Sequence, residues 1–118
     1  MQFVKPNFLI RSFYSSLIWK VNTNEKIIYL TFDDGPIPEI TPWVLQQLRD
    51  FNAKATFFCI GENVKKNPQI FEQIKSEKHQ IGHHTFNHVN GWKTKNEIYF
   101  ENVERGNDVA TSHLFRPP

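Results

Sequence analysis

The sequence predicts an α/β fold built on parallel strands, and three observations support that prediction. From Lys26 onward, short apolar runs alternate with amphipathic segments at a spacing of roughly thirty residues. The apolar runs are rich in β-branched and aromatic residues, which is typical of buried strands. Two cap-and-proline pairs, Thr41-Pro42 and Asn67-Pro68, mark where amphipathic segments begin. Such an alternation implies parallel strands joined by right-handed crossovers.

The first strand is expected over residues 27–32, where the chain is almost entirely apolar. A helix should follow, with Thr41 as its cap and Pro42 at its first helical position, and it should end near Asn52. The apolar side chains spaced for its buried face are Val44, Leu45 and Leu48.

The second strand is expected over residues 55–60, where Gly61 stops it. Asn67 then caps a second helix that begins with Pro68. Its apolar stripe consists of Ile70, Phe71 and Ile74.

A third, shorter strand should end around Gly82-His83. Thr94 and Glu97 have the spacing of a capping box, so a helix is expected from there to about Ala110. Residues 114–116 would begin a fourth strand. Four strands cannot close a parallel barrel, which normally uses about eight strands and 250 residues. We therefore expect the first part of a longer barrel in preference to an open sheet.

Composition limits the function classes. With 118 residues, 39% hydrophobic and 22% charged, the chain is typical of one globular domain. Its net charge of +2 comes from interspersed charges and argues against a nucleic-acid partner. A single cysteine, Cys59, excludes an intramolecular disulfide and a cysteine-rich zinc module, and we expect it to be buried.

Residues 1–24 form a separate amphipathic segment with basic residues and no acid. Leu9, Phe13 and Leu17 share one apolar face at helical spacing. We expect this helix to cover the bottom of the fold; the alternative is weak contact with a membrane surface. The apolar run is too short for a cleavable signal or a membrane-spanning helix, so the compartment stays unknown.

Two adjacent carboxylates, Asp33 and Asp34, end the first strand. Neighbouring residues in a strand point to opposite faces, so these two can share a pocket only if the chain turns there. Gly35 and Pro36 favour such a turn. One carboxylate could then bind a divalent metal while the other remains free as a base. An ordinary turn without chemistry is the alternative.

The second cluster holds His84 and His88, whose i, i+4 spacing places both rings on one side of a helical turn. With one Asp they can supply two nitrogens and one oxygen to a cation, most simply zinc. Cobalt, manganese or nickel would suit the same ligands. His83 is expected to be only a neighbour of the site. Arg116 reaches the same edge, where its guanidinium could hold Asp33 ionised.

Three motifs occur in one order: Thr31-Phe-Asp-Asp-Gly-Pro36, His84-Thr-Phe-Asn-His88 and Phe115-Arg-Pro-Pro118. In this the chain resembles the NodB-like polysaccharide deacetylases, carbohydrate esterase family 4, over residues 25–118. The resemblance implies the N-terminal half of a distorted (β/α) barrel. It also implies a metal-dependent hydrolase that acts on carbon–nitrogen, but not peptide, bonds. The substrate would be an acetylated glycan such as chitooligosaccharide or peptidoglycan, or O-acetylated xylan.

By the same resemblance, Asp33 is the catalytic base and Arg116 holds it. The implied metal ligands are Asp34, His84 and His88. The family's later motifs, including the histidine that acts as general acid, are not in this sequence. We therefore expect these 118 residues by themselves to bind metal weakly and to be a poor catalyst.

Three other interpretations share part of this pattern. A haloacid-dehalogenase phosphatase would need Asp-x-Asp, with both carboxylates on one side of a strand. A two-histidine, one-carboxylate iron oxygenase would need an antiparallel barrel, which the strand–helix alternation disfavours. The third alternative is an inactive metal- or carbohydrate-binding fragment of a deacetylase.

Overall fold

A parallel three-stranded sheet forms the centre of the structure, a computed structural model that describes residues 7–118. The strands are hydrogen-bonded in the order β1-β2-β3 and consist of Leu30–Asp33, Ala55–Cys59 and Gln80–His83. The predicted α/β class with parallel strands is therefore confirmed.

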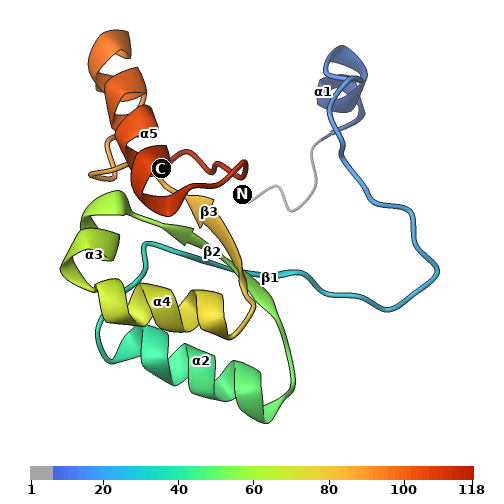
Figure 1. The fold of residues 1–118 in the computed structure, drawn as a ribbon. Helices are drawn as coiled ribbons and strands as arrows, with labels where there is room; N and C mark the ends of the chain where they lie inside the picture. Colours follow the sequence, from blue (N-terminus) through green and yellow to red (C-terminus); the bar gives the residue numbers. More distant parts are fainter. Residues whose placement is uncertain (1–6) are drawn as a thin grey trace.

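Helices α2 and α4 lie side by side next to the sheet, whereas α5 lies beyond β3 and contacts α3 (Figure 1). The core forms between the sheet and these helices, with Leu45, Phe57 and Ile74 almost fully buried. The helices in this part of the chain are α2 (Ile40–Asp50), α3 (Gly61–Lys66), α4 (Pro68–Ser76) and α5 (Asn96–Ala110).

The first strand differs from the sequence prediction in its bounds and burial. Strand β1 begins at Leu30, and residues 27–29 are exposed outside it. The strand itself is mostly exposed because it pairs only with β2. Beside it, the side chains of Leu30, Phe32 and Trp43 line an open apolar groove.

The predicted helix caps are wrong in detail. Helix α2 begins at Ile40, and the Thr41 hydroxyl instead accepts a hydrogen bond from the Ile37 N–H at 2.9 Å. Asn67 does precede α4, but its side-chain amide donates to the carbonyl oxygen of Pro36 at 3.2 Å and does not cap the helix. Both side chains bond to the loop after β1, which is adjacent to Thr41 in sequence and which tertiary contact brings close to Asn67.

The predicted capping box before α5 is also absent. Lys95 precedes the helix, and the Thr94 hydroxyl donates to the Asn90 carbonyl oxygen at 2.8 Å. The predicted fourth strand is only a single parallel bridge between His83 and Phe115. Gly61, expected only to stop β2, begins the unpredicted helix α3. A glycine is compatible with either role.

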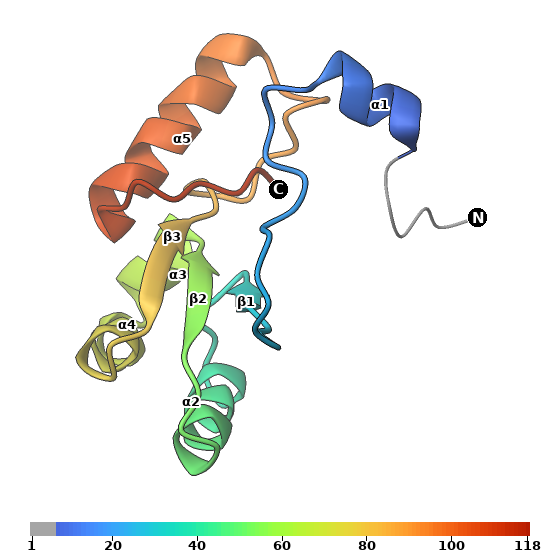
Figure 2. The same cartoon turned by 90° about the vertical axis from the view of Figure 1, so that its right-hand side faces the viewer.

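The N-terminal helix does not cover the bottom of the fold. Helix α1 (Phe8–Phe13) contains no buried residue, and Phe13 is 84% exposed. Both views show α1 apart from the sheet (Figures 1 and 2). The predicted packing is therefore wrong for the described residues, while Lys5 and the rest of residues 1–6 lie outside them. Contact with a membrane surface stays a prediction, and no described helix is long and apolar enough to cross a membrane.

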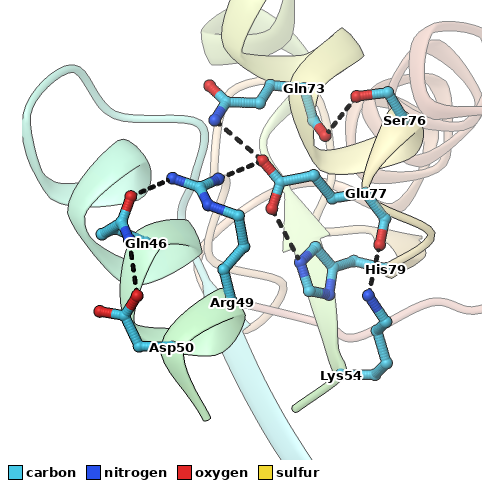
Figure 3. Close-up of polar contacts among 8 residues, drawn as sticks. All are labelled: Gln46, Arg49, Asp50, Lys54, Gln73, Ser76, Glu77 and His79. Atoms are coloured by element: carbon cyan, nitrogen blue, oxygen red, sulfur yellow. Dashed lines mark hydrogen bonds and ion pairs between the residues drawn. The ribbon is translucent and has the colours of Figure 1, made fainter. Parts of the chain in front are cut away.

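A partly buried polar network joins α2 and α4 at the amino-terminal edge of the sheet (Figure 3). Arg49 pairs with Glu77, whose carbonyl oxygen accepts from Lys54 Nζ at 2.8 Å. His79 Nδ1 accepts from the Ala55 N–H at 3.4 Å, and its Nε2 lies 3.8 Å from Glu77 Oε2. Burial lowers the pKa of His79, and the Lys54 charge lowers it further, against an opposing effect of Glu77. The folded state therefore favours neutral His79.

This network predicts that acid weakens the fold. Because the pKa of His79 lies below its ordinary 6.5, its contribution to stability is complete above that pH. The contribution is lost as the pH falls from there through the folded-state value. Urea unfolding between about pH 5 and pH 8 should show this loss.

The matched variants are His79→Gln and His113→Gln, since His113 is exposed. We expect a shallower pH dependence of the unfolding free energy in His79→Gln and an unchanged one in His113→Gln. An equally steep loss in His79→Gln and in the wild type would refute the assignment.

Candidate metal centre

The sequence-predicted site residues meet at the carboxyl ends of the strands. Asp33 is the last residue of β1, and His84 directly follows β3. The Arg116 N–H donates to the carbonyl oxygen of His83 at 3.1 Å, which brings the third motif beside the second. Parallel pairing explains the convergence, because all three strands end at the same edge of the sheet.

Asp34, His84 and His88 form a group of three side chains that could hold one cation. Their ligand atoms all lie within 4.8 Å of one another. Asp34 Oδ1 is 3.6 Å from His84 Nε2 and 3.3 Å from His88 Nε2. Bonds of zinc to nitrogen or oxygen are about 2.1 Å long, so tetrahedral ligands lie about 3.4 Å apart. The donor types and these separations fit a zinc-sized cation.

The orientation of His84 adds to this fit. Its Nδ1 lies 2.7 Å from the carbonyl oxygen of Arg116, which can only accept a hydrogen bond. Nδ1 must therefore carry a proton, which leaves Nε2 as the ring nitrogen that faces the Asp34 carboxylate. A cation could bind between these two groups. Such a second hydrogen bond is the usual way in which a metal-binding imidazole is oriented.

The turn after β1 presents both carboxylates, as predicted. Asp34 has φ 69°, in the left-handed region, and its carbonyl oxygen accepts from Asn63 Nδ2 at 2.7 Å. Gly35 continues the turn, and its carbonyl oxygen accepts from the Ile60 N–H at 3.0 Å. The bend lets Asp34 join the histidines while Asp33 lies beside Arg116.

Asp33 is held by Arg116. The Arg116 guanidinium donates to Asp33 Oδ1 at 2.7 Å and to the Thr31 hydroxyl at 3.1 Å, and it lies over the Phe58 ring at 4.1 Å. Both charged side chains are more than a third exposed, so the pair contributes at most about 1 kcal/mol to stability. Its main effect is to fix the position of the Asp33 carboxylate.

His83 and Trp92 lie outside this group. His83 is buried and stacks on Phe115 with ring centroids 4.7 Å apart, and burial, with neighbouring His84, lowers its pKa. Trp92 is 99% exposed, so it does not pack against the described residues.

The loop of residues 84–88 has an unusual backbone. Thr85 and His88 both have positive φ, at 64° and 57°. The Gly61 N–H donates to the Thr85 carbonyl oxygen at 3.0 Å, and the Glu62 N–H donates to that of Phe86 at 2.9 Å. The first residues of α3 therefore hold one side of this loop.

Helix α5 holds the other side, and the sequence analysis missed its contribution. A Cβ added to Gly106 would lie 2.7 Å from the backbone carbon of Thr85, so only glycine allows this close approach. The buried face of α5 consists of Asn102, Gly106 and Ala110 at four-residue spacing. A polar and two small residues on one helix face are the signal that could have revealed the contact.

Gly106→Ala should destabilise the protein although it occurs within a helix. Replacing a helical glycine by alanine normally gains about 1 kcal/mol. Here the new methyl group would overlap backbone, and overpacking costs about 1–3 kcal/mol. Urea unfolding should show a net loss of stability, whereas the exposed Asp108→Ala should change it by less than about 0.5 kcal/mol. A stabilised Gly106→Ala would contradict the close approach.

Comparison with known proteins identifies the family. The sequence profile of the family described as polysaccharide deacetylase matches residues 20–118. The chain therefore belongs to the polysaccharide deacetylase family, as the three motifs predicted.

Individual relatives agree with this assignment. A peptidoglycan-N-acetylglucosamine deacetylase of Bacillus cereus is 45% identical over 105 residues, covering 85% of this chain and 49% of the relative. A chitooligosaccharide deacetylase of Azorhizobium caulinodans is 48% identical over 71 residues, covering 60% of this chain and 34% of the relative. The chain thus spans at most about half the length of these relatives.

Solved structures show the same fold. The Bc1960 peptidoglycan N-acetylglucosamine deacetylase superimposes with a TM-score of 0.74 at 38% identity, over 80% of this chain and 47% of that one. Peptidoglycan deacetylase PdaC from Bacillus subtilis superimposes with a TM-score of 0.73 at 28% identity. The match covers 83% of this chain and 52% of PdaC. The described sheet and helices thus match about half of a family 4 carbohydrate esterase.

Proposed function

We propose that this protein removes acetyl groups from N-acetylglucosamine units of a polysaccharide, with a divalent metal held by Asp34, His84 and His88. Zinc is the first choice of metal, and cobalt, manganese or nickel are the alternatives. One observation carries the proposal: the three ligand atoms lie within 4.8 Å of one another, next in sequence to Asp33, whose carboxylate accepts a hydrogen bond from Arg116. The relatives named as peptidoglycan and chitooligosaccharide deacetylases support the substrate class. An O-acetylated glycan is the alternative substrate.

The chemistry follows from the separate tasks of the two carboxylates. A divalent cation held by Asp34, His84 and His88 would supply Lewis acidity for the acetyl carbonyl and for water. Asp33 then accepts the proton of the attacking water, for which its Oδ2 is available while Oδ1 accepts from Arg116. Arg116 keeps that carboxylate in position through its hydrogen bond to Oδ1. The products are acetate and an amino sugar, whose departing nitrogen must gain a proton.

Metal binding is tested first, with His88→Ala. The His88 side chain is 48% exposed, so its removal should leave the core intact. Loss of one of three protein ligands should weaken zinc binding by at least about 100-fold, measured by competition with a chromogenic chelator. His113→Ala removes an exposed histidine outside the site and should bind zinc as the wild type does. Equal affinities in His88→Ala and the wild type would contradict the assigned ligand.

Acetate release then tests catalysis, with Asp33→Asn as the control. Asparagine keeps the size of the side chain but cannot accept the proton, so activity should fall by about 10²–10⁴-fold while zinc binding is retained. Acetate released from chitooligosaccharide, peptidoglycan and acetylated xylan is measured for both proteins. Because the chain spans about half of its relatives, we expect slower turnover than in a full-length relative. No wild-type release above the Asp33→Asn background would contradict deacetylase activity in this chain.

A non-catalytic role in binding metal or carbohydrate is the second candidate. The observation that favours it is the coverage of about half of each solved relative. Zinc binding that depends on His88, without any acetate release, would support this second candidate.

A further inference from the structure

The side chain of Asn102, on α5, bonds directly to the loop between the two metal-site histidines. Asn102 is only 6% exposed, and its Oδ1 accepts from the N–H groups of Phe86 and Asn87 at 2.8 Å each. Its Nδ2 donates to Asn87 Oδ1 at 3.1 Å. Burial of an amide is costly unless it is hydrogen-bonded. Here, every one of these hydrogen bonds goes to the segment between His84 and His88.

We propose that Asn102 is a positioning residue that sets the separation of His84 and His88 for the metal. The inference rests on the metal site of the proposed function and goes beyond its ligands. Asn102 touches neither imidazole, so its effect is transmitted through the backbone of Phe86 and Asn87. Residues of this kind typically change metal affinity by 10–100-fold.

The backbone of the loop explains why such support is needed. Thr85 and His88 have positive φ, a conformation that is unfavourable for non-glycine residues and persists only where the surroundings impose it. Helix α3 binds the carbonyl oxygens on one side of the loop, at Thr85 and Phe86. Asn102 binds the N–H groups on the other side. Without it, the loop could relax and move the two imidazoles apart.

The contacts also limit the expected effect. The Phe86 N–H lies 3.0 Å from the backbone carbonyl oxygen of Asn102, as well as close to its side chain. Loss of the side chain would leave that bond in place. The Asn87 N–H, in contrast, would lose the acceptor that Asn102 supplies. We therefore expect weakened metal binding with the fold retained.

The experiment compares zinc affinity and the visible spectrum of the cobalt-loaded protein in three variants. Asn102→Leu removes the polar contacts and should weaken zinc binding by about 10–100-fold and alter the cobalt spectrum. Asn102→Asp keeps acceptors for both N–H groups and loses only the donor to Asn87 Oδ1, so it should bind zinc more tightly than Asn102→Leu. Asn107→Ala is the matched control, since Asn107 lies on the same helix and its Oδ1 accepts from the Ser112 N–H instead.

The thermal midpoint of each metal-free variant separates positioning from general instability. If Asn102→Leu does not fold, Asn102→Ala replaces it, because alanine creates no overlap in the loop. If a folded Asn102→Leu or Asn102→Ala variant showed the zinc affinity and cobalt spectrum of the wild type, the positioning role of Asn102 would be overturned. The proposed metal site would not be affected by that result. A wild type that binds no zinc would overturn the proposed metal site and this inference together.

Discussion

The constraint on which the site depends is the hydrogen bonding of the loop of residues 84–88 from two sides. This loop carries both imidazoles, yet its backbone takes conformations that non-glycine residues avoid. The first turn of α3 binds its carbonyl oxygens, and α5 binds its N–H groups. Because each side engages consecutive peptide units, the loop cannot shift without breaking several bonds.

The sheet places this loop next to the carboxylates. Three parallel strands end at one edge, where Asp33 and His83 are the last residues of their strands. The third motif is attached to the same edge by bonds between His83 and the residues on either side of Phe115. A site assembled from segments more than eighty residues apart thus depends on only a few backbone contacts.

The two adjacent aspartates have different surroundings. Asp34 faces two imidazole nitrogens, whereas Asp33 faces a guanidinium that also lies over an aromatic ring. The separation requires the bend at Asp34, which Asn63 holds through the backbone. The proposed metal ligand and the proposed base can therefore be adjacent in sequence without competing for the same cation.

The sequence alone predicted the parallel α/β class, the membership of the polysaccharide deacetylase family and most of the buried faces of α2 and α4, where only Ile70 is half-buried. These conclusions come from periodicity and from motifs, which are local properties of the chain. The three motifs also singled out Asp34, His84 and His88, which the structure brings together, although their role as ligands stays a proposal.

Other features depend on contacts between segments that are far apart in the sequence. Asn67 bonds to the loop after β1 instead of capping a helix, and Asn63, Asn102 and Gly106 support the site from helices without belonging to a motif. The N-terminal helix is amphipathic in sequence but exposed in the structure. The physical reason is the same in each case. A polar side chain or an apolar face is defined by its sequence, whereas its partner depends on which distant segment the fold brings within reach.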